Sequence, residues 1–248
     1  MYNPYSLEGK TILVTGASSG IGQATAIECS KMGATVIITA RDRNRLNHTF
    51  ELLEGNGHQI LTCDLNDNDQ IVSLTKEIPE IQGLVSNAGY TKIAPLQFID
   101  GDDLKGMLQV NTIAHIMLLK NLVKAKKIKK GASVVFTSSL AGLGYTTVGN
   151  SMYTACKGAI SAFVKGAAKE LAIKGIRVNA VCPGMVETNI LNDNVVSKEQ
   201  IEEDKKTYPL KRYGKPEEVA WAMIYLLSDA SAWTTGTNLI LDGGYSIR

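Results

Sequence analysis

Short runs of apolar and β-branched residues alternate along the chain with longer stretches that have helical periodicity. Continuous apolar runs of this length are typical of strands that are buried on both faces of a parallel sheet. Because these runs alternate with helices, the pattern predicts βαβ units with right-handed crossovers, and therefore an α/β fold. The predicted strands are residues 11–15, 35–39, 59–63, 83–86, 133–138, 176–182 and 238–242.

Polar and glycine-rich stretches follow the predicted strands directly. In an open parallel sheet, ligands bind outside the carboxyl ends of the strands. No composition shift or internal repeat marks a second domain, so we predict a single domain over residues 1–248 with its functional site at that edge. The stretches, in chain order, are TGASSGIG, ARDR, DLND, NAG, SSLAG and PGMVET.

Composition and charge narrow the classes of function. The formal net charge of +2 gives no global field that would favour nucleic acid, and no apolar run approaches the ~18 residues of a membrane span. The N-terminal segment lacks the apolar region of a signal peptide, and the four cysteines are scattered, so we expect reduced thiols in a cytoplasmic protein. The three histidines do not cluster with cysteines or acids at ligand spacing, so we predict no metal site.

The stretch TGASSGIG joins the first predicted strand to a helix. Glycine permits positive φ and lets a ligand approach the backbone closely. The helix that follows offers free N–H groups and the positive end of its dipole to a phosphate group. The spacing is G-x-x-x-G-x-G, and the alternative interpretation is a tight βα turn without a ligand. The residues predicted to contact a phosphate-containing cofactor are Gly16, Ser18, Ser19, Gly20, Ile21 and Gly22.

A second pattern lies in NSMYTACKGAI (residues 150–160), where Tyr153 and Lys157 are four residues apart. Residues i and i+4 share one face of a helix, so the phenol and the ammonium group can meet. Chance alone supplies such a pair about as often as not, so the pair gains its weight from the motifs around it.

Taken together, the motifs resemble those of the short-chain dehydrogenases/reductases. The residues that carry the resemblance are TGASSGIG (15–22), NAG (87–89), SSLAG (138–142), YTACK (153–157), PGMVET (183–188) and TGTNLILDGG (235–244). They follow the order of the family over nearly the whole chain. The resemblance implies a Rossmann-type three-layer domain with a seven-stranded parallel sheet. It also implies hydride transfer between NAD(P) and a carbonyl or alcohol.

The resemblance implies four catalytic residues. Tyr153 matches the proton donor, and Lys157 matches the residue that also binds the nicotinamide ribose. Ser139 matches the hydroxyl that orients the carbonyl, with Ser138 as a weaker rival, and Asn111 matches the asparagine that holds a water in a proton relay. A cation ~4 Å from Tyr153, at an effective dielectric near 20, would favour the tyrosinate by about 4 kcal/mol, or roughly 3 pKa units. We therefore expect Lys157 to lower the pKa of Tyr153 toward neutrality.

The loop after the second strand bears on the choice of cofactor. An acid there accepts a hydrogen bond from the ribose 2′-OH of NAD, whereas an arginine favours the 2′-phosphate of NADP. Ala40 stands where NAD-using relatives usually carry Asp, and Arg41 follows, so we predict NADP(H); Asp42 leaves NAD(H) open. By resemblance, the cofactor site also comprises Asp64, Leu65, Asn87, Ala88, Gly89, Tyr153, Lys157, Pro183, Gly184, Val186 and Thr188.

The resemblance also bears on substrate and partners. Residues 185–208 match a substrate lid, although an exposed helical excursion is the simpler interpretation. The chain looks like the 3-oxoacyl-(acyl-carrier-protein) reductases, which implies a ketone or acyl thioester substrate and a homotetramer. The lysine cluster in residues 120–130, with Lys174, is a candidate dock for an acidic acyl carrier protein, or simply a solvated helix end. The alternatives are a sugar, polyol or steroid dehydrogenase, and a non-catalytic NADP-binding regulator.

Overall fold

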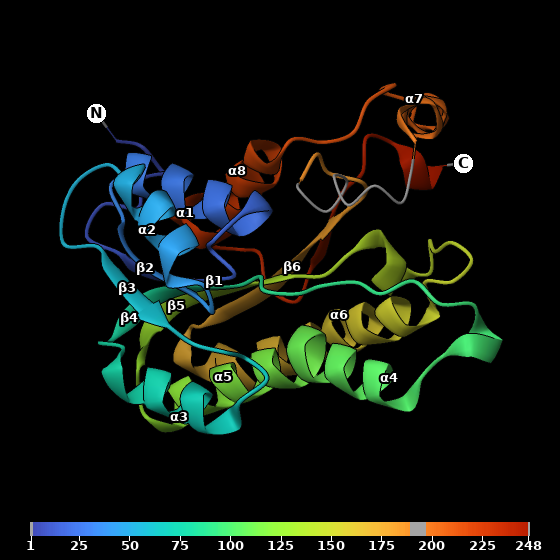
Figure 1. Cartoon of the computed structure of the whole chain (residues 1–248). Coiled ribbons are helices and arrows are strands. Elements are labelled where there is room, and N and C mark those ends of the chain that lie inside the picture. Colours follow the sequence, from blue (N-terminus) through green and yellow to red (C-terminus); the bar gives the residue numbers. More distant parts are fainter. Residues whose placement is uncertain (1, 189–196, 248) are drawn as a thin grey trace.

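The computed structural model describes residues 2–188 and 197–247. A seven-stranded parallel sheet forms its centre, with strand order β3-β2-β1-β4-β5-β6-β7 (Figure 1). The predicted fold class is therefore confirmed. The strands are β1 (Thr11–Thr15), β2 (Thr35–Ala40), β3 (Gln59–Thr62), β4 (Ile81–Ser86), β5 (Ile128–Thr137), β6 (Arg177–Pro183) and β7 (Asn238–Leu241).

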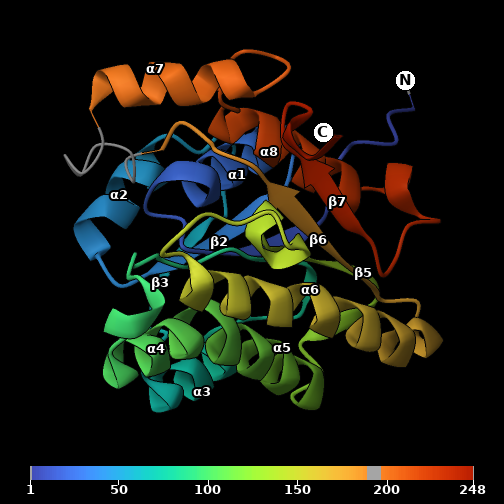
Figure 2. The same cartoon turned by 90° about the vertical axis from the view of Figure 1, so that its right-hand side faces the viewer.

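Helices cover both faces of the sheet (Figures 1 and 2). Side chains of β1 alternate between the two faces, so Leu13 packs in one apolar core while Ile12 and Val14 pack in the other. One layer consists of α1 (Gly20–Lys31), α2 (Arg43–Glu51) and α8 (Pro216–Leu227). The other consists of α3 (Asn68–Glu77), α4 (Gly101–Leu108), α5 (Ala114–Lys124) and α6 (Ser151–Leu171).

Strand β5 begins five residues before the predicted start at residue 133. Its first residue, Ile128, pairs with Ile81 of β4, which also starts earlier than predicted. Lys129, Lys130 and Gly131 follow and are exposed, so this part of the strand lacks the apolar run that marks the others. The buried part of β5 matches the prediction.

A turn of π-helix (Gln109–Ile113) joins α4 to α5. Single π-helical turns inside α-helices occur frequently at functional sites. This turn places Asn111 on the inner side of the helical layer, where its side chain is fully buried. The π-helical turn was not predicted from the sequence.

Helix α7 (Lys198–Thr207) lies apart from the two layers, on the side of α1 and α8 (Figures 1 and 2). A capping box starts it: the Ser197 hydroxyl accepts from the Gln200 amide N–H, and the Gln200 side chain accepts from the Ser197 N–H. This helix belongs to the segment 185–208 that was predicted to be a lid or a helical excursion, of which residues 189–196 lie outside the described residues. In the described ranges, no helix is long and apolar enough to cross a membrane.

Candidate active site

Tyr153 and Lys157 lie on the first two turns of α6, at the carboxyl edge of the sheet. The Ser139 hydroxyl, just after β5, hydrogen-bonds to Tyr153, and the Lys157 Nζ lies 5.6 Å from the centre of the Tyr153 ring. A Cβ added at Gly89 would lie 2.5 Å from the Asn111 Oδ1 and 3.6 Å from the Lys157 Nζ. The structure thus brings together all four residues of the predicted catalytic set.

Burial dominates the acidity of Tyr153. It raises the pKa of Tyr153 to about 12, although the hydrogen bond from Ser139 acts in the opposite direction. The expectation that Lys157 brings this pKa toward neutrality is therefore wrong for the protein alone. The sequence shows the spacing of the two side chains but not the loss of water around the phenol, which disfavours the tyrosinate.

Lys157 is buried, with 3% of its surface exposed. Its ammonium group donates a hydrogen bond of 2.8 Å to the Thr137 carbonyl at the end of β5. Burial lowers the pKa of Lys157 to about 8. The side chain is therefore held in place before any ligand binds, and it retains a titration near physiological pH.

Ser138 and Ser139 point in different directions. The Ser138 hydroxyl is buried against α6, where it donates to the Lys157 carbonyl at 2.9 Å and contacts the Ser161 hydroxyl at 2.7 Å. The Ser139 hydroxyl accepts from the Ala141 N–H at 3.2 Å and faces Tyr153. Ser138 thus acts within the fold, and Ser139 is the hydroxyl beside the candidate proton donor.

The Asn111 side chain makes three hydrogen bonds to backbone groups. Its amide nitrogen donates to the carbonyls of Tyr90 and Met107, both at 3.0 Å, and its oxygen accepts from the Tyr90 N–H at 3.2 Å. Asn111 therefore fixes the chain after Gly89. Its oxygen accepts one hydrogen bond of the two that an amide oxygen can accept, so the relay water that the resemblance implies stays a prediction.

The glycine loop fits the approach of a phosphate group. Ser19 precedes α1 without a side-chain cap to the helix, and the first turn of α1 carries no acid, so its N–H groups stay open within the described structure. Gly16 has φ +66°, and a Cβ there would lie 2.7 Å from the Ala88 Cα. A Cβ on Gly22 would lie 2.2 Å from the Gly16 carbonyl oxygen. The remaining loop residues, Ser18, Gly20 and Ile21, are partly exposed.

Thr15 at the end of β1 holds the segment after β4. Its hydroxyl accepts from the N–H groups of Asn87, at 2.9 Å, and Ala88, at 3.2 Å. The Asn87 side chain in turn accepts from the Thr137 hydroxyl at 2.9 Å. These bonds tie Asn87 and Ala88 to the ends of β1 and β5, beside the glycine loop.

The two acids near the predicted adenosine end are both used locally. Asp42 caps α2 by accepting from the Arg45 N–H at 3.1 Å. Asp64 accepts from the Asn66 backbone N–H at 2.9 Å, and Leu65 beside it is buried. Arg41 is exposed and makes no hydrogen bond or ion pair with any described residue, so its guanidinium is available to an anionic group.

The segment after β6 returns toward the glycine loop. The Gly184 N–H donates to the Leu241 carbonyl at 3.0 Å, which continues the pairing of Pro183 with β7. Val186 is buried and forms a parallel bridge with Gly214. The Thr188 side chain lies against Gly20, because a Cβ there would be 3.2 Å from the Thr188 Cγ2. This segment therefore lies against the start of α1, next to the glycine loop.

Comparison with known proteins shows the family to which the chain belongs. Residues 16–246 match the family model described as enoyl-(acyl carrier protein) reductase. The chain is 36% identical to a 3-oxoacyl-(acyl-carrier-protein) reductase from Thermotoga maritima over 97% of this chain and 99% of the relative. It is also 34% identical to a glucose 1-dehydrogenase from Gluconobacter oxydans over 96% of this chain and 92% of that enzyme.

The chain belongs to the short-chain dehydrogenase/reductase family.

A solved structure of the family shows the same fold. It is a putative 2-deoxy-D-gluconate 3-dehydrogenase from Agrobacterium tumefaciens with bound NADP, and it is similar to this short-chain dehydrogenase/reductase with a TM-score of 0.89 and 30% identity over 100% of both chains. The relatives thus include enzymes named for acyl and for sugar substrates, and the family membership alone does not choose between them.

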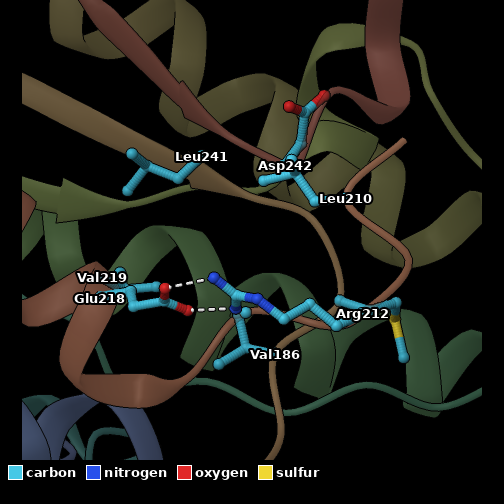
Figure 3. Close-up of a pocket in the computed structure, with 10 residues that line it drawn as sticks. Val186, Leu210, Arg212, Glu218, Val219, Leu241 and Asp242 are labelled. Atoms are coloured by element: carbon cyan, nitrogen blue, oxygen red, sulfur yellow. Dashed lines mark hydrogen bonds and ion pairs between the residues drawn. The ribbon is translucent and has the colours of Figure 1, made fainter. Parts of the chain in front are cut away.

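In the present chain, a pocket of about 150 Å³ lies beside the segment that follows β6. Figure 3 shows the Arg212 side chain extending to Glu218. The two residues form a bidentate ion pair, with guanidinium nitrogens 2.6 and 2.7 Å from the carboxylate oxygens. Arg212 holds the pKa of Glu218 at about 2. None of the four catalytic candidates lines the pocket, whereas Val186 does. The pocket therefore belongs to the segment around Val186 and is separate from the reacting centre.

Sequence reasoning missed His115 and Ser86. His115 is buried on α5 and contacts the Ser86 hydroxyl and the Ala88 carbonyl. Spacing could have suggested it, because His115 lies four residues after Asn111 on the same helical segment. No group of histidines, cysteines and acids in the described ranges could hold a metal ion.

Proposed function

We propose that this short-chain dehydrogenase/reductase is an NADP(H)-dependent enzyme that reduces a carbonyl to an alcohol, most like a 3-oxoacyl reductase. The observation that carries the proposal is the contact of Ser139, Tyr153 and Lys157 at the same sheet edge as the open N-terminus of α1. When bound, the nicotinamide supplies a hydride to the carbonyl carbon. The remaining tasks fall to the side chains of the chain itself.

Each catalytic side chain has a distinct task. Ser139 donates a hydrogen bond to the substrate oxygen, and Tyr153 Oη donates the proton that converts the developing alkoxide to an alcohol. An alkoxide is more basic than a phenolate, so a tyrosine whose pKa is raised to about 12 still protonates it. The Lys157 ammonium, 5.6 Å from the ring, stabilises the tyrosinate that remains.

Lys157 gives the reaction a pH dependence. We expect kcat/KM for NADPH to fall as the pH rises through about 8, because the ammonium group is present below the pKa of Lys157 and lost above it. This parameter reports groups of the free enzyme, which is the form described here. A profile that stays flat from pH 6 to 10 would contradict the assignment of the titration to Lys157.

Arg41 decides the choice between NADPH and NADH. We expect Arg41→Ala to lower kcat/KM for NADPH by roughly 10- to 100-fold, because a charge-assisted hydrogen bond to the 2′-phosphate is lost, and to leave kcat/KM for NADH nearly unchanged. Arg43→Ala is the matched control, since Arg43 donates to the Ile60 carbonyl at 3.3 Å. Equal losses with both cofactors, or from both variants, would argue against a 2′-phosphate site at Arg41.

Exposed apolar side chains near the site favour an acyl substrate. Ile93, Leu96 and Phe98 are 65%, 80% and 68% exposed in the segment that follows Gly89. The Ala94 N–H donates to the Gly149 carbonyl at 2.9 Å, which joins this segment to the loop before Tyr153. An acyl chain gains from contact with such side chains, whereas a polyol does not. The similarity to glucose 1-dehydrogenase keeps a sugar as the second candidate.

The lysine cluster lies at the other edge of the sheet. Lys120 and Lys124 are on the last two turns of α5, and Lys129 and Lys130 lie near the start of β5. Ser139, by contrast, follows the end of that strand. A carrier protein docked there does not face Tyr153 of the same chain. We therefore propose a free ketone or acyl thioester as the minimal substrate, with carrier docking dependent on a neighbouring subunit.

A homotetramer in the cytoplasm completes the proposal. Four of the exposed residues of α6 are small, which permits a second helix to approach closely at Ala155, Ala159, Ala162 and Gly166. The molar mass from light scattering tests the assembly. All four cysteines are buried free thiols, which is compatible with a reducing compartment.

A substrate panel tests the proposed reaction. We expect NADPH oxidation with acetoacetyl thioesters and slower or no turnover of glucose with NADP. Turnover of glucose alone would favour the sugar dehydrogenase. Tight NADPH binding without turnover of any ketone or alcohol would leave the non-catalytic regulator.

A further inference from the structure

His115 forms a fully paired polar cluster in the apolar layer between α5 and the sheet. Its Nδ1 lies 2.5 Å from the Ser86 hydroxyl, and its Nε2 lies 2.6 Å from the Ala88 carbonyl oxygen. His115 and Ser86 are 2% and 1% exposed. Buried polar groups are costly unless paired, so both contacts define how the ring sits.

The partners fix the tautomer of the ring. A carbonyl oxygen only accepts, so the Ala88 contact requires a proton on Nε2. In the neutral ring Nδ1 is then an acceptor, and the Ser86 hydroxyl donates to it. The Ala88 carbonyl therefore selects the Nε2–H tautomer of His115, and Ser86 pairs the Nδ1 that this tautomer leaves as an acceptor.

The ring stays neutral at the pH of the reaction. Burial first, and then the positive charge of Lys157, lower the pKa of His115 to about 3, against the raising effect of the Ala88 carbonyl. His115 is thus a constant hydrogen-bond donor and takes no part in the titration of Lys157.

Ala88 is the point through which this donor acts. Its N–H donates to the Thr15 hydroxyl and its carbonyl accepts from His115, so both polar atoms of the residue are held from opposite sides. Its Cα lies so close to Gly16 that a Cβ added to Gly16 would be 2.7 Å from it. Gly89, the next residue, borders Asn111 and Lys157. A shift of the Ala88 carbonyl therefore moves residues 88 and 89, which contact the glycine loop on one side and Lys157 on the other.

We propose that His115 is a positioning residue: as the Nε2–H tautomer, with Ser86 paired to its Nδ1, it holds the Ala88 carbonyl and thereby fixes residues 87–89 in the geometry that binds the nicotinamide cofactor. The inference rests on the proposed function for the identity of the cofactor.

Two amide substitutions separate this role from simple packing. His115→Gln places an amide N–H near the position of Nε2, whereas His115→Asn reaches only the position of Nδ1. We expect the Kd for NADPH to stay within about threefold for His115→Gln and to rise roughly tenfold or more for His115→Asn, since the shorter amide leaves the Ala88 carbonyl unpaired. At saturating NADPH, kcat should recover to within about threefold in both variants.

His58 supplies a matched control. It bridges two backbone groups in the same way, with the Val36 N–H donating to Nδ1 at 3.0 Å and the Glu54 carbonyl 2.9 Å from Nε2, but it lies at the far edge of the sheet. We expect His58→Gln and His58→Asn to change Tm without changing the Kd for NADPH.

The experiment reads binding by titration calorimetry and folding by thermal melts, so it needs no substrate. A rise in Kd for His115→Asn that is absent from His115→Gln supports the positioning role. Equal Kd values for the two variants overturn it, whether both match the wild type or both are impaired. If no ketone is turned over, the proposed reaction fails while this comparison still stands.

Discussion

Replacing Tyr153 with Phe should lower kcat for carbonyl reduction by about 10²- to 10⁴-fold, the range that loss of a positioned general acid produces. The substitution removes only Oη, while the ring remains to contact Lys157 as it does at 5.6 Å now. Ser139 keeps its bond from the Ala141 N–H, so the substrate oxygen still meets one donor. We therefore expect the Kd for NADPH to stay within about threefold, and the loss to appear in kcat.

Steady-state kinetics at saturating NADPH, with direct titration of NADPH binding, measure the two quantities. Tyr225→Phe is the control. Tyr225 is on α8, away from the carboxyl edge of the sheet, and the substitution removes a hydroxyl that lies 3.1 Å from the Thr234 hydroxyl. Its kcat should match that of the wild type. Full activity in Tyr153→Phe would refute the proposed proton donor, and a large rise in the Kd for NADPH would place the hydroxyl in cofactor binding instead.

The fold followed from the sequence because its strands are buried on both faces. Val36, Ile37 and Ile38 in β2 are all fully buried, and such a run has few alternatives in an α/β chain. The start of β5 escaped prediction because Lys129 and Lys130 are exposed there and break the apolar run. The edge at which the site forms was predictable for a general reason: parallel strands bring their carboxyl ends together.

The chemistry of the site was less accessible from sequence. Spacing placed Tyr153 and Lys157 on one helix face, yet the pKa of Tyr153 depends on burial, which spacing does not report. His115 and Ser86 are 29 residues apart, so their bond is set by how α5 packs on β4. The bond of Asp42 to the Arg45 N–H makes it the cap of α2, a role that the stretch ARDR does not reveal, and the choice between NADP(H) and NAD(H) stays a prediction.

Gly22→Ala should disrupt the glycine loop even though alanine is the better helix former. Alanine in an exposed helix is favoured over glycine by about 1 kcal/mol. Here, however, the added Cβ would lie 2.2 Å from the Gly16 carbonyl oxygen and 2.6 Å from the Asn87 Nδ2. Because the first of these is backbone, the loop must move rather than a side chain. Overpacking of this kind costs about 1–3 kcal/mol of the free energy of unfolding.

The displaced atoms explain why cofactor binding should suffer more than stability. Gly16 lies against Ala88, and Asn87 is tied to Thr137, so a shift at Gly22 spreads to both sides of the predicted phosphate and nicotinamide sites. We expect the Kd for NADPH to rise by two orders of magnitude or more, equivalent to about 3 kcal/mol. Chemical denaturation and calorimetric titration measure the two effects.

Gly101→Ala is the matched control for this substitution. Gly101 begins α4, is exposed, and has no described atom within 4 Å of an added Cβ. We expect this variant to bind NADPH with the affinity of the wild type and to be equally or slightly more stable. If Gly22→Ala behaved in the same way, the close approach of α1 to Gly16 would not control the cofactor site, and the phosphate-binding role of the loop would lose its structural basis.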